Sequence, residues 1–239
     1  MLSTSNISVN GAQGWRRRRG VDAYGRHRHT IEPVIASVCV GDLSADDRDA
    51  LLQEEFVAVD TETSGLDWRS DSLALCQLFS PSSGAVLVQI TDRPAPNLLT
   101  VLSAPSVTKV FHFAPFDLQF LGSTLGVIPA PVRCTKAAAK LLYPGANPRD
   151  HSLGALLKEH LGVSLDKGAV RVSDWRARVL TDQQIAYAAG DVEHLLDLFD
   201  LLNEKIEQAG LGAVYEAIGR YMPVAAQITL MGAPDPLSY

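Results

Sequence analysis

The sequence predicts an α/β fold in which a mixed five-stranded sheet is flanked by helices. An almost uninterrupted apolar run at residues 56–59 is typical of a central strand that is covered on both faces. Two more strand-like runs follow it as a meander, and helical and strand-like patterns then alternate. A long helical pattern from Thr181 to Gly210 closes this order, and the sequence contains no internal repeat.

The strands are predicted from short apolar runs bounded by turn residues. Residues 81–84, Pro-Ser-Ser-Gly, are a turn signal between the second and third runs. These two strands should therefore form a hairpin. The five expected strands span residues 56–59, 73–79, 85–90, 107–113 and 132–134.

The helices are predicted from capping residues and helical spacing. Pro115 is well placed to open a helix after the fourth strand, because proline favours the first helical position. In the last helix, Thr181 and Gln184 form a capping-box signature, and the apolar residues after them keep helical spacing. Two more helices are expected at about 135–142 and 151–161. This order of elements fits the ribonuclease H-like mixed sheet.

Length and composition suit one well-packed domain with short extensions. The chain has 239 residues, and 46% of them are apolar. No apolar run reaches the ~18–20 residues that cross a bilayer. The N-terminus lacks the apolar core of a secretory signal, so we expect a cytoplasmic protein. The chain has three widely spaced cysteines, Cys39, Cys76 and Cys134. Their spacing fits buried thiols in a reducing compartment and fits neither a zinc site nor a disulfide framework.

The two ends of the chain differ from its centre. Residues 1–30 are rich in Ser, Asn and Gly and then strongly basic, with no apolar period of a strand or helix, so we predict a disordered basic arm. This arm is either a contact for nucleic acid or a partner, or a solvated tail. We expect the main domain over residues 31–210 and a C-terminal helical extension over residues 211–239.

The net charge of −6 argues against a simple electrostatic clamp on nucleic acid. A site that binds phosphates through metal ions inverts this logic, because its carboxylates hold the cations and the cations meet the phosphates. The charge therefore leaves a metal-dependent nuclease open.

Asp60 and Glu62 form the first motif. They lie two residues apart at the end of the first strand, so both carboxylates should point to the same face. Two acids on one face repel each other unless a cation lies between them. Hard divalent ions such as Mg²⁺ or Mn²⁺ suit that arrangement. Alone, the pair also fits a solvated strand end or a turn.

Asp117, in the first turn after Pro115, is the second motif. A helix dipole favours an acid there by ~0.3–1 kcal/mol, which is a sufficient structural reason by itself. His112, just before this turn, fits a core histidine at a strand end better than a ligand.

Tyr187 and Asp191 form the third motif, at i and i+4 on one face of the last helix. The helical pattern turns Asp191 inward, where an unpaired carboxylate is costly. A metal ion shared with Asp60 and Glu62 would offset the cost of burying the Asp191 carboxylate. The alternative is that this face of the helix ends at solvent.

Taken together and in this order, the motifs resemble the DEDD exonuclease superfamily, in its tyrosine-bearing branch, and within it the ribonuclease D-like proteins. The likeness runs from about Phe56 to Leu202 and includes further landmarks: Cys134-Thr135-Lys136, His151-Ser152-Leu153, Lys167, Ser173-Asp174-Trp175 and Gln184.

The resemblance implies a role for each motif residue. Asp60, Glu62 and Asp191 would hold the first metal ion, and Asp60 would bridge to a second. Asp117 would support the second ion through water, and Tyr187 would orient the attacking water. One ion would lower the pKa of that water while the other stabilises the leaving 3′ oxygen. The cofactors would be two divalent ions, and oxygen ligands suit Mg²⁺ and Mn²⁺ alike.

The resemblance also implies the substrate and where it binds. The product would be a nucleoside 5′-monophosphate, released from the 3′ end of a single strand. In related proofreading exonucleases the residue types at four positions line the terminal nucleotide: Thr63, Leu66, His112 and Phe116.

The chain departs from the family at Phe113, where many relatives have an asparagine that would offer the substrate a polar contact. Longer ribonuclease D proteins also carry helical nucleic-acid-binding domains, which the short C-terminal segment here cannot hold. Residues 221–235 resemble the join between exonuclease and polymerase in family A DNA polymerases, although an amphipathic closing helix explains them equally well.

Three function classes follow from these observations. The first is an exoribonuclease, and the second is a DNA-directed 3′–5′ exonuclease of the proofreading type. The two share a metal cage and differ in contacts to the 2′-OH, so the sequence does not separate them. The third is an inactive nucleic-acid-binding module, which would be expected to lack one metal carboxylate; all four are present. A mononucleotide-binding protein would want a Gly-rich phosphate loop, which is missing.

Overall fold

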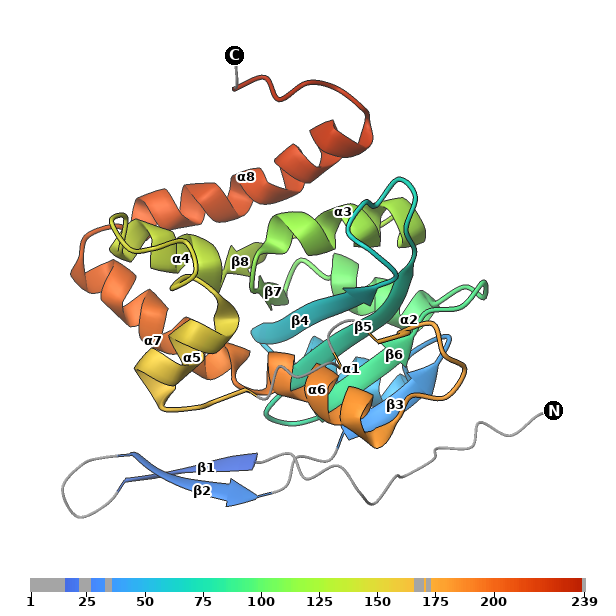
Figure 1. The fold of residues 1–239 in the computed structure, drawn as a ribbon, viewed down its shortest axis with the longest axis horizontal. Coiled ribbons are helices and arrows are strands. Elements are labelled where there is room, and N and C mark those ends of the chain that lie inside the picture. Colours follow the sequence, from blue (N-terminus) through green and yellow to red (C-terminus); the bar gives the residue numbers. More distant parts are fainter. Residues whose placement is uncertain (1–15, 22–26, 33–35, 166–169, 171–172, 238–239) are drawn as a thin grey trace.

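The computed structural model describes residues 16–21, 27–32, 36–165, 170 and 173–237. Its centre is a mixed six-stranded sheet with the strand order β3-β6-β5-β4-β7-β8 (Figure 1). The strands are β3 (Ala36–Val40), β4 (Phe56–Thr63), β5 (Leu73–Ser80), β6 (Gly84–Gln89), β7 (Thr108–Phe111) and β8 (Val132–Cys134). The predicted meander is confirmed, since β4 pairs antiparallel with β5 and β5 with β6.

The prediction of five strands was one short. The missed strand is β3, which pairs in parallel with β6 at the edge of the sheet. Only five residues long and partly buried, it leaves a weaker pattern than the buried central strands. The α/β class and the ribonuclease H-like arrangement of the sheet are as expected.

Helices cover both faces of the sheet, and the alternation of side chains along β4 explains why. Val57 and Val59 pack on one face with residues of α1, α2, α3 and α8, while Ala58 packs on the other with residues of α5, α6 and α7. The helices are α1 (Ala45–Leu52), α2 (Pro96–Ser103), α3 (Ala114–Leu125), α4 (Thr135–Leu142), α5 (Leu153–Leu161), α6 (Asp182–Glu193), α7 (Leu195–Gln208) and α8 (Gly212–Leu230).

The predicted closing helix is two helices. Its capping box at Thr181 and Gln184 is present, but α6 ends at His194, where φ −100° and ψ 2° leave the helical region and α7 begins. Apolar spacing continues across the break because both helices pack on the same face of the sheet. Helical spacing in the sequence therefore could not reveal it.

The ends of the chain also carry secondary structure. In the N-terminal region, β1 (Arg16–Val21) pairs antiparallel with β2 (His27–Glu32), which differs from the predicted disordered arm. The prediction rested on the lack of an apolar period, and such a period reflects the burial of side chains. A strand pair is held together by backbone hydrogen bonds, which need no apolar period. The rest of that arm lies outside the described residues.

At the other end, α8 runs alongside α3 (Figure 1), with Met222 and Ala226 buried in the same core as β4. Within the described part of the chain, no helix is both long enough and apolar enough to span a membrane.

Candidate active site

Three carboxylates from two elements meet at one end of the sheet. Asp60 and Glu62 come from the end of β4, and Asp191 comes from the last turns of α6. One oxygen from each lies within 4.8 Å of those of the other two. The expected common face of Asp60 and Glu62 is therefore realised, and α6 carries Asp191 to it. Carboxylate oxygens gathered in this way could hold a divalent metal ion.

Asp117 lies beside this trio but is not part of it. Its side chain is 2% exposed, and its Oδ1 accepts a 2.7 Å hydrogen bond from the Thr61 hydroxyl. Thr61 stands between the two acids of β4 and points to the opposite face, where α3 packs. Burial raises the pKa of Asp117 to about 7, while the Thr61 hydrogen bond lowers it. This acid is thus held at the edge of the site in a poorly solvated position.

Tyr187 is one helical turn before Asp191, as expected. A side-chain hydrogen bond joins the two residues. Burial, and then the negative charges of Asp191 and Glu62, raise the pKa of the Tyr187 hydroxyl well above its usual range. The hydroxyl therefore keeps its proton at any physiological pH and can act as a hydrogen-bond donor. Its ring lies 5.8 Å from that of buried Trp175, at an angle of 47°.

Thr63 and Leu66, predicted to line a terminal nucleotide, follow the two acids of β4. The Thr63 hydroxyl donates a 2.5 Å hydrogen bond to the Gly65 carbonyl, which shapes the turn after the strand. Leu66, on this turn, is 85% exposed. An apolar side chain this exposed next to the acids is available to a ligand.

His112 and Phe116, the other two predicted lining residues, flank the start of α3. Nδ1 of His112 is 2.9 Å from the Thr135 hydroxyl, which ties the end of β7 to the start of α4. Phe116 is half-buried and its ring packs 4.9 Å from that of Phe120. The structure thus gives both residues a structural contact beside the site.

Two features of the site were not predicted from the sequence. The Thr61–Asp117 hydrogen bond joins residues 56 positions apart, and the period-2 pattern indicated only that Thr61 faces away from its neighbours. Phe113 was assigned to a strand, but it adopts the left-handed conformation (φ 76°, ψ 47°) as the N-cap of α3. The sequence did hold a signal for this: Phe113 directly precedes Ala114-Pro115, where a helix was expected to begin.

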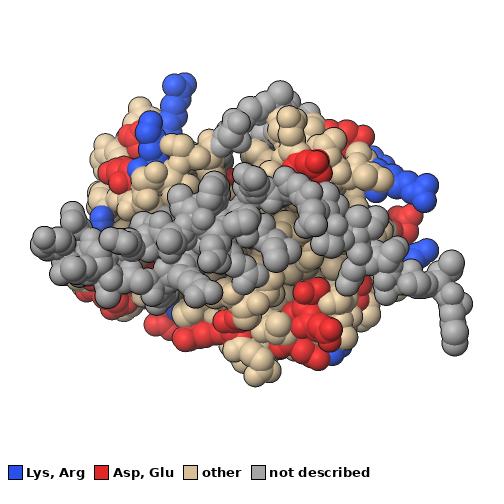
Figure 2. Space-filling view, turned by 90° about the horizontal axis from the view of Figure 1, so that it is seen from below, with Lys and Arg blue, Asp and Glu red and all other residues tan. Residues whose placement is uncertain are grey.

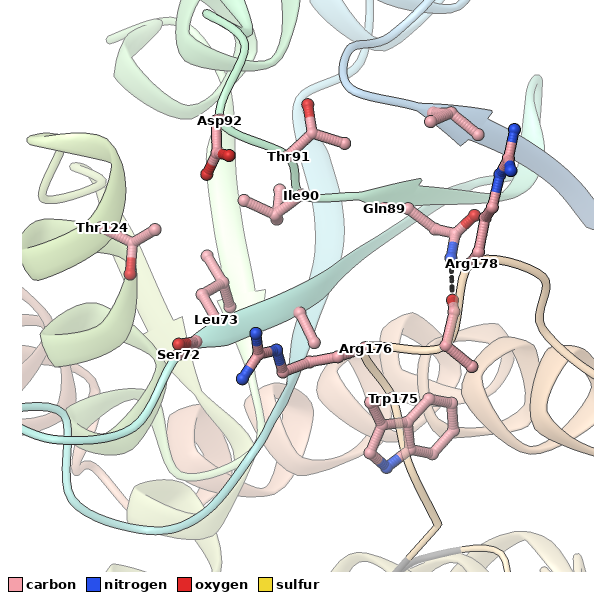
Figure 3. Close-up of a pocket in the computed structure, with 13 residues that line it drawn as sticks. Ser72, Leu73, Gln89, Ile90, Thr91, Asp92, Thr124, Trp175, Arg176 and Arg178 are labelled. Carbon is pink, nitrogen blue, oxygen red and sulfur yellow. Dashed lines mark hydrogen bonds between the residues drawn. The ribbon is translucent and has the colours of Figure 1, made fainter.

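A cavity of about 430 Å³ lies between the start of β5, the end of β6 and residues 175–178 (Figure 3). The Gln89 amide donates a 3.1 Å hydrogen bond to the Ala177 carbonyl across it. Arg176 and Arg178 also line it. Trp175 forms part of its wall and contacts Tyr187, so the cavity adjoins the site without containing the carboxylates.

Charge on the surface is mixed. On the face in Figure 2, acidic side chains gather along one side and Lys or Arg side chains lie toward the ends. Among the side chains that Figure 2 colours, Lys and Arg form no continuous patch.

Comparison with known proteins gives consistent matches. A family model described as 3′–5′ exonuclease matches residues 43–207. The chain is 38% identical over 165 residues to ribonuclease D of Gluconacetobacter diazotrophicus, covering 67% of this chain and 40% of that protein. It is 30% identical over 181 residues to ribonuclease D of Escherichia coli, covering 76% of this chain and 45% of that protein. The chain thus spans less than half the length of these relatives.

Solved structures agree. Brucella melitensis NrnC bound to pGG is 37% identical with a TM-score of 0.77, covering 85% of this chain and 98% of that one. NrnC with bound Mg²⁺ is 36% identical with a TM-score of 0.76 and the same coverage. Escherichia coli RNase D is 29% identical with a TM-score of 0.68, covering 79% of this chain and 50% of that one.

Proposed function

The chain belongs to the 3′–5′ exonuclease family, and from that premise we propose that it is a metal-dependent exoribonuclease. It removes nucleoside 5′-monophosphates from the 3′ end of single-stranded RNA. The observation that carries the proposal is the convergence of Asp60, Glu62 and Asp191 within 4.8 Å, with Tyr187 on the same helix face as Asp191.

The donor set fits divalent ions. Asp60, Glu62 and Asp191 would hold the first ion, Asp60 would bridge to the second, and buried Asp117 would support the second through water. Two bound ions would supply an activated water and charge stabilisation at the leaving oxygen. Mg²⁺ and Mn²⁺ are both suited to carboxylate oxygens.

The protein's own groups position the reacting atoms. The Tyr187 hydroxyl keeps its proton and is hydrogen-bonded to Asp191, so it lies beside the carboxylates, where it would orient the attacking water. Its packing on Trp175 restrains the ring. Thr63, Leu66, His112 and Phe116 would line the terminal nucleotide, and the exposure of Leu66 supports this for that residue.

The ribonuclease D relatives favour RNA, and the pGG complex of NrnC favours a short single-stranded 3′ end. A DNA-directed exonuclease is the second candidate. The carboxylates would hold metal ions and would not contact the 2′-OH, so they do not distinguish RNA from DNA. An inactive module is disfavoured by the presence of all four carboxylates. Three free thiols, Cys39, Cys76 and Cys134, favour a reducing compartment, and we propose the cytoplasm.

A labelled-strand assay tests the proposal. The protein is incubated with 5′-labelled single-stranded RNA and DNA in Mg²⁺, Mn²⁺ or EDTA, and the ladder is followed. We expect metal-dependent shortening from the 3′ end, faster for RNA. Asp60→Ala should lower the rate at least ~10³-fold, since several kcal/mol of transition-state stabilisation are lost.

Asp182→Ala is the matched control, because Asp182 is an exposed acid in the first turn of α6 and should leave the rate unchanged. No shortening of either strand with metal would overturn the catalytic proposal. An Asp60→Ala protein as active as the wild type would overturn the site assignment.

A further inference from the structure

Phe113 lies between the end of β7 and the start of α3, in a costly backbone conformation. It adopts φ 76° and ψ 47°, a left-handed conformation in which a residue with a bulky side chain costs roughly 1–2 kcal/mol. Among the described residues outside glycine, it alone has a positive φ. Its ring is also 44% exposed to solvent. Asparagine tolerates this backbone better, so neither backbone geometry nor core packing explains a phenylalanine here.

Contacts on both sides hold the residue in place. The Phe113 backbone N–H donates a 3.3 Å hydrogen bond to Sγ of Cys134, and its carbonyl accepts a 3.1 Å hydrogen bond from the Phe116 N–H. The Lys136 ammonium lies 4.4 Å from the centroid of the ring. A cation therefore lies over the ring of a phenylalanine that is 44% exposed.

The position of this ring relates it to the reacting centre. Phe113 is the N-cap of α3, the helix whose first turn carries Asp117, and Asp117 is hydrogen-bonded to Thr61 between the two acids of β4. An exposed aromatic face next to a phosphate-processing centre suits a nucleobase, because every base has a π-face that can stack.

On this basis we propose that Phe113 and Lys136 form a stacking platform for one of the two nucleobases that flank the scissile phosphodiester. The inference rests on the proposed exonuclease function. The free face of the Phe113 ring stacks on the base, and the Lys136 ammonium, besides orienting the ring, attracts the adjacent phosphate. Phe113 thus substitutes base stacking for the polar contact that an asparagine would make. Stacking does not read the sugar, so the platform serves ribose and deoxyribose ends alike.

Binding of short oligonucleotides that carry 2-aminopurine tests the platform. The fluorescent base is placed at the 3′-terminal position in one strand and at the penultimate position in another, with Ca²⁺ replacing Mg²⁺ to slow cleavage. An otherwise identical strand carries an abasic site at the same position. We expect the wild type to quench 2-aminopurine at one of these positions and to bind the matching abasic strand about 10-fold more weakly, in line with ~1–3 kcal/mol per stacked base.

Measuring each variant with both the base-bearing and the abasic strand gives a thermodynamic double-mutant cycle. Phe113→Ala and Phe113→Asn should lose the quenching and bind the base-bearing and abasic strands alike, whereas Phe113→Tyr should behave as the wild type. Lys136→Gln should lower the affinity for both strands equally and reduce the salt dependence of binding. The difference in affinity between the base-bearing and the abasic strand should remain. Tyr221→Ala, which removes an exposed aromatic ring on α8, is the matched control and should change nothing.

The outcomes separate this inference from the proposed function. If Phe113→Ala keeps the full abasic penalty at both positions, the platform is wrong, even if the wild type is an active exonuclease. If the wild type stacks the base but shortens neither RNA nor DNA with metal, the platform stands and the catalytic proposal fails. Phe113→Asn removes backbone strain and should not unfold more readily in urea, so a loss of stacking there cannot be attributed to misfolding.

Discussion

Asp117→Asn replaces a buried acid with a neutral side chain of the same shape. In the metal-free protein, the carboxyl is 2% exposed and burial raises its pKa from 3.8 to about 7. The folded protein therefore holds this proton more tightly than the unfolded chain does. The stability contributed by the protonated group is fully present below pH 3.8 and is lost as pH rises through 7.

The size of the loss follows from the shift in pKa. About three pKa units at 1.36 kcal/mol each correspond to an upper limit of roughly 4 kcal/mol in the free energy of unfolding. The asparagine does not ionise, and its carbonyl oxygen can still accept the hydrogen bond from the Thr61 hydroxyl, 2.7 Å away in the wild type. In EDTA at pH 8 the variant should therefore be more stable than the wild type by up to that amount, and near pH 4 the two should be nearly equal.

Urea unfolding in EDTA, followed by tryptophan fluorescence from pH 4 to pH 8.5, measures this difference. Exonuclease activity with metal should meanwhile fall at least about 10²-fold, equivalent to ~2.7 kcal/mol in the activation free energy. The exposed Asp182→Asn should change neither quantity. A stability difference independent of pH, or an Asp117→Asn protein less stable at pH 8, would refute the argument that burial of this acid destabilises the apo fold.

Three further predictions concern other parts of the molecule. Tyr187→Phe should retain metal affinity, measured calorimetrically, yet turn over more slowly, because only the hydroxyl next to Asp191 is lost; an unchanged turnover would remove the tyrosine from the site. Burial lowers the pKa of Lys109 from 10.5 to about 8, so the unfolded chain binds more protons between these values and stability should rise with pH there. Lys109→Met should reduce that slope of the unfolding free energy, by at most about 1.4 kcal/mol per pH unit; equal slopes would contradict this. Gly219→Ala should destabilise by about 1–3 kcal/mol in urea, since its Cβ would lie 2.6 Å from the Val132 carbonyl oxygen, whereas a Cβ at Gly145 meets nothing within 4 Å and serves as the control.

Local patterns were sufficient for much of the fold. The apolar run of β4, the turn after β5 and the capping box of α6 each depend on a few neighbouring residues, and all three are present where expected. Patterns failed where a neighbour distant in sequence decides the conformation. The short strand β3 exists through its pairing with β6, and the break at His194 leaves apolar spacing intact because α6 and α7 pack on the same face.

The candidate site divides in the same way. The sequence by itself determined that Asp60 and Glu62 share a face and that Tyr187 and Asp191 share another, because strand and helix periods are set by backbone geometry. Only the tertiary structure decided that these two faces meet within 4.8 Å, that Thr61 reaches Asp117, and that Lys136 lies over the Phe113 ring. These contacts join segments separated by tens of residues, and their distances follow from how α3, α4 and α6 pack on the sheet, which no local period encodes.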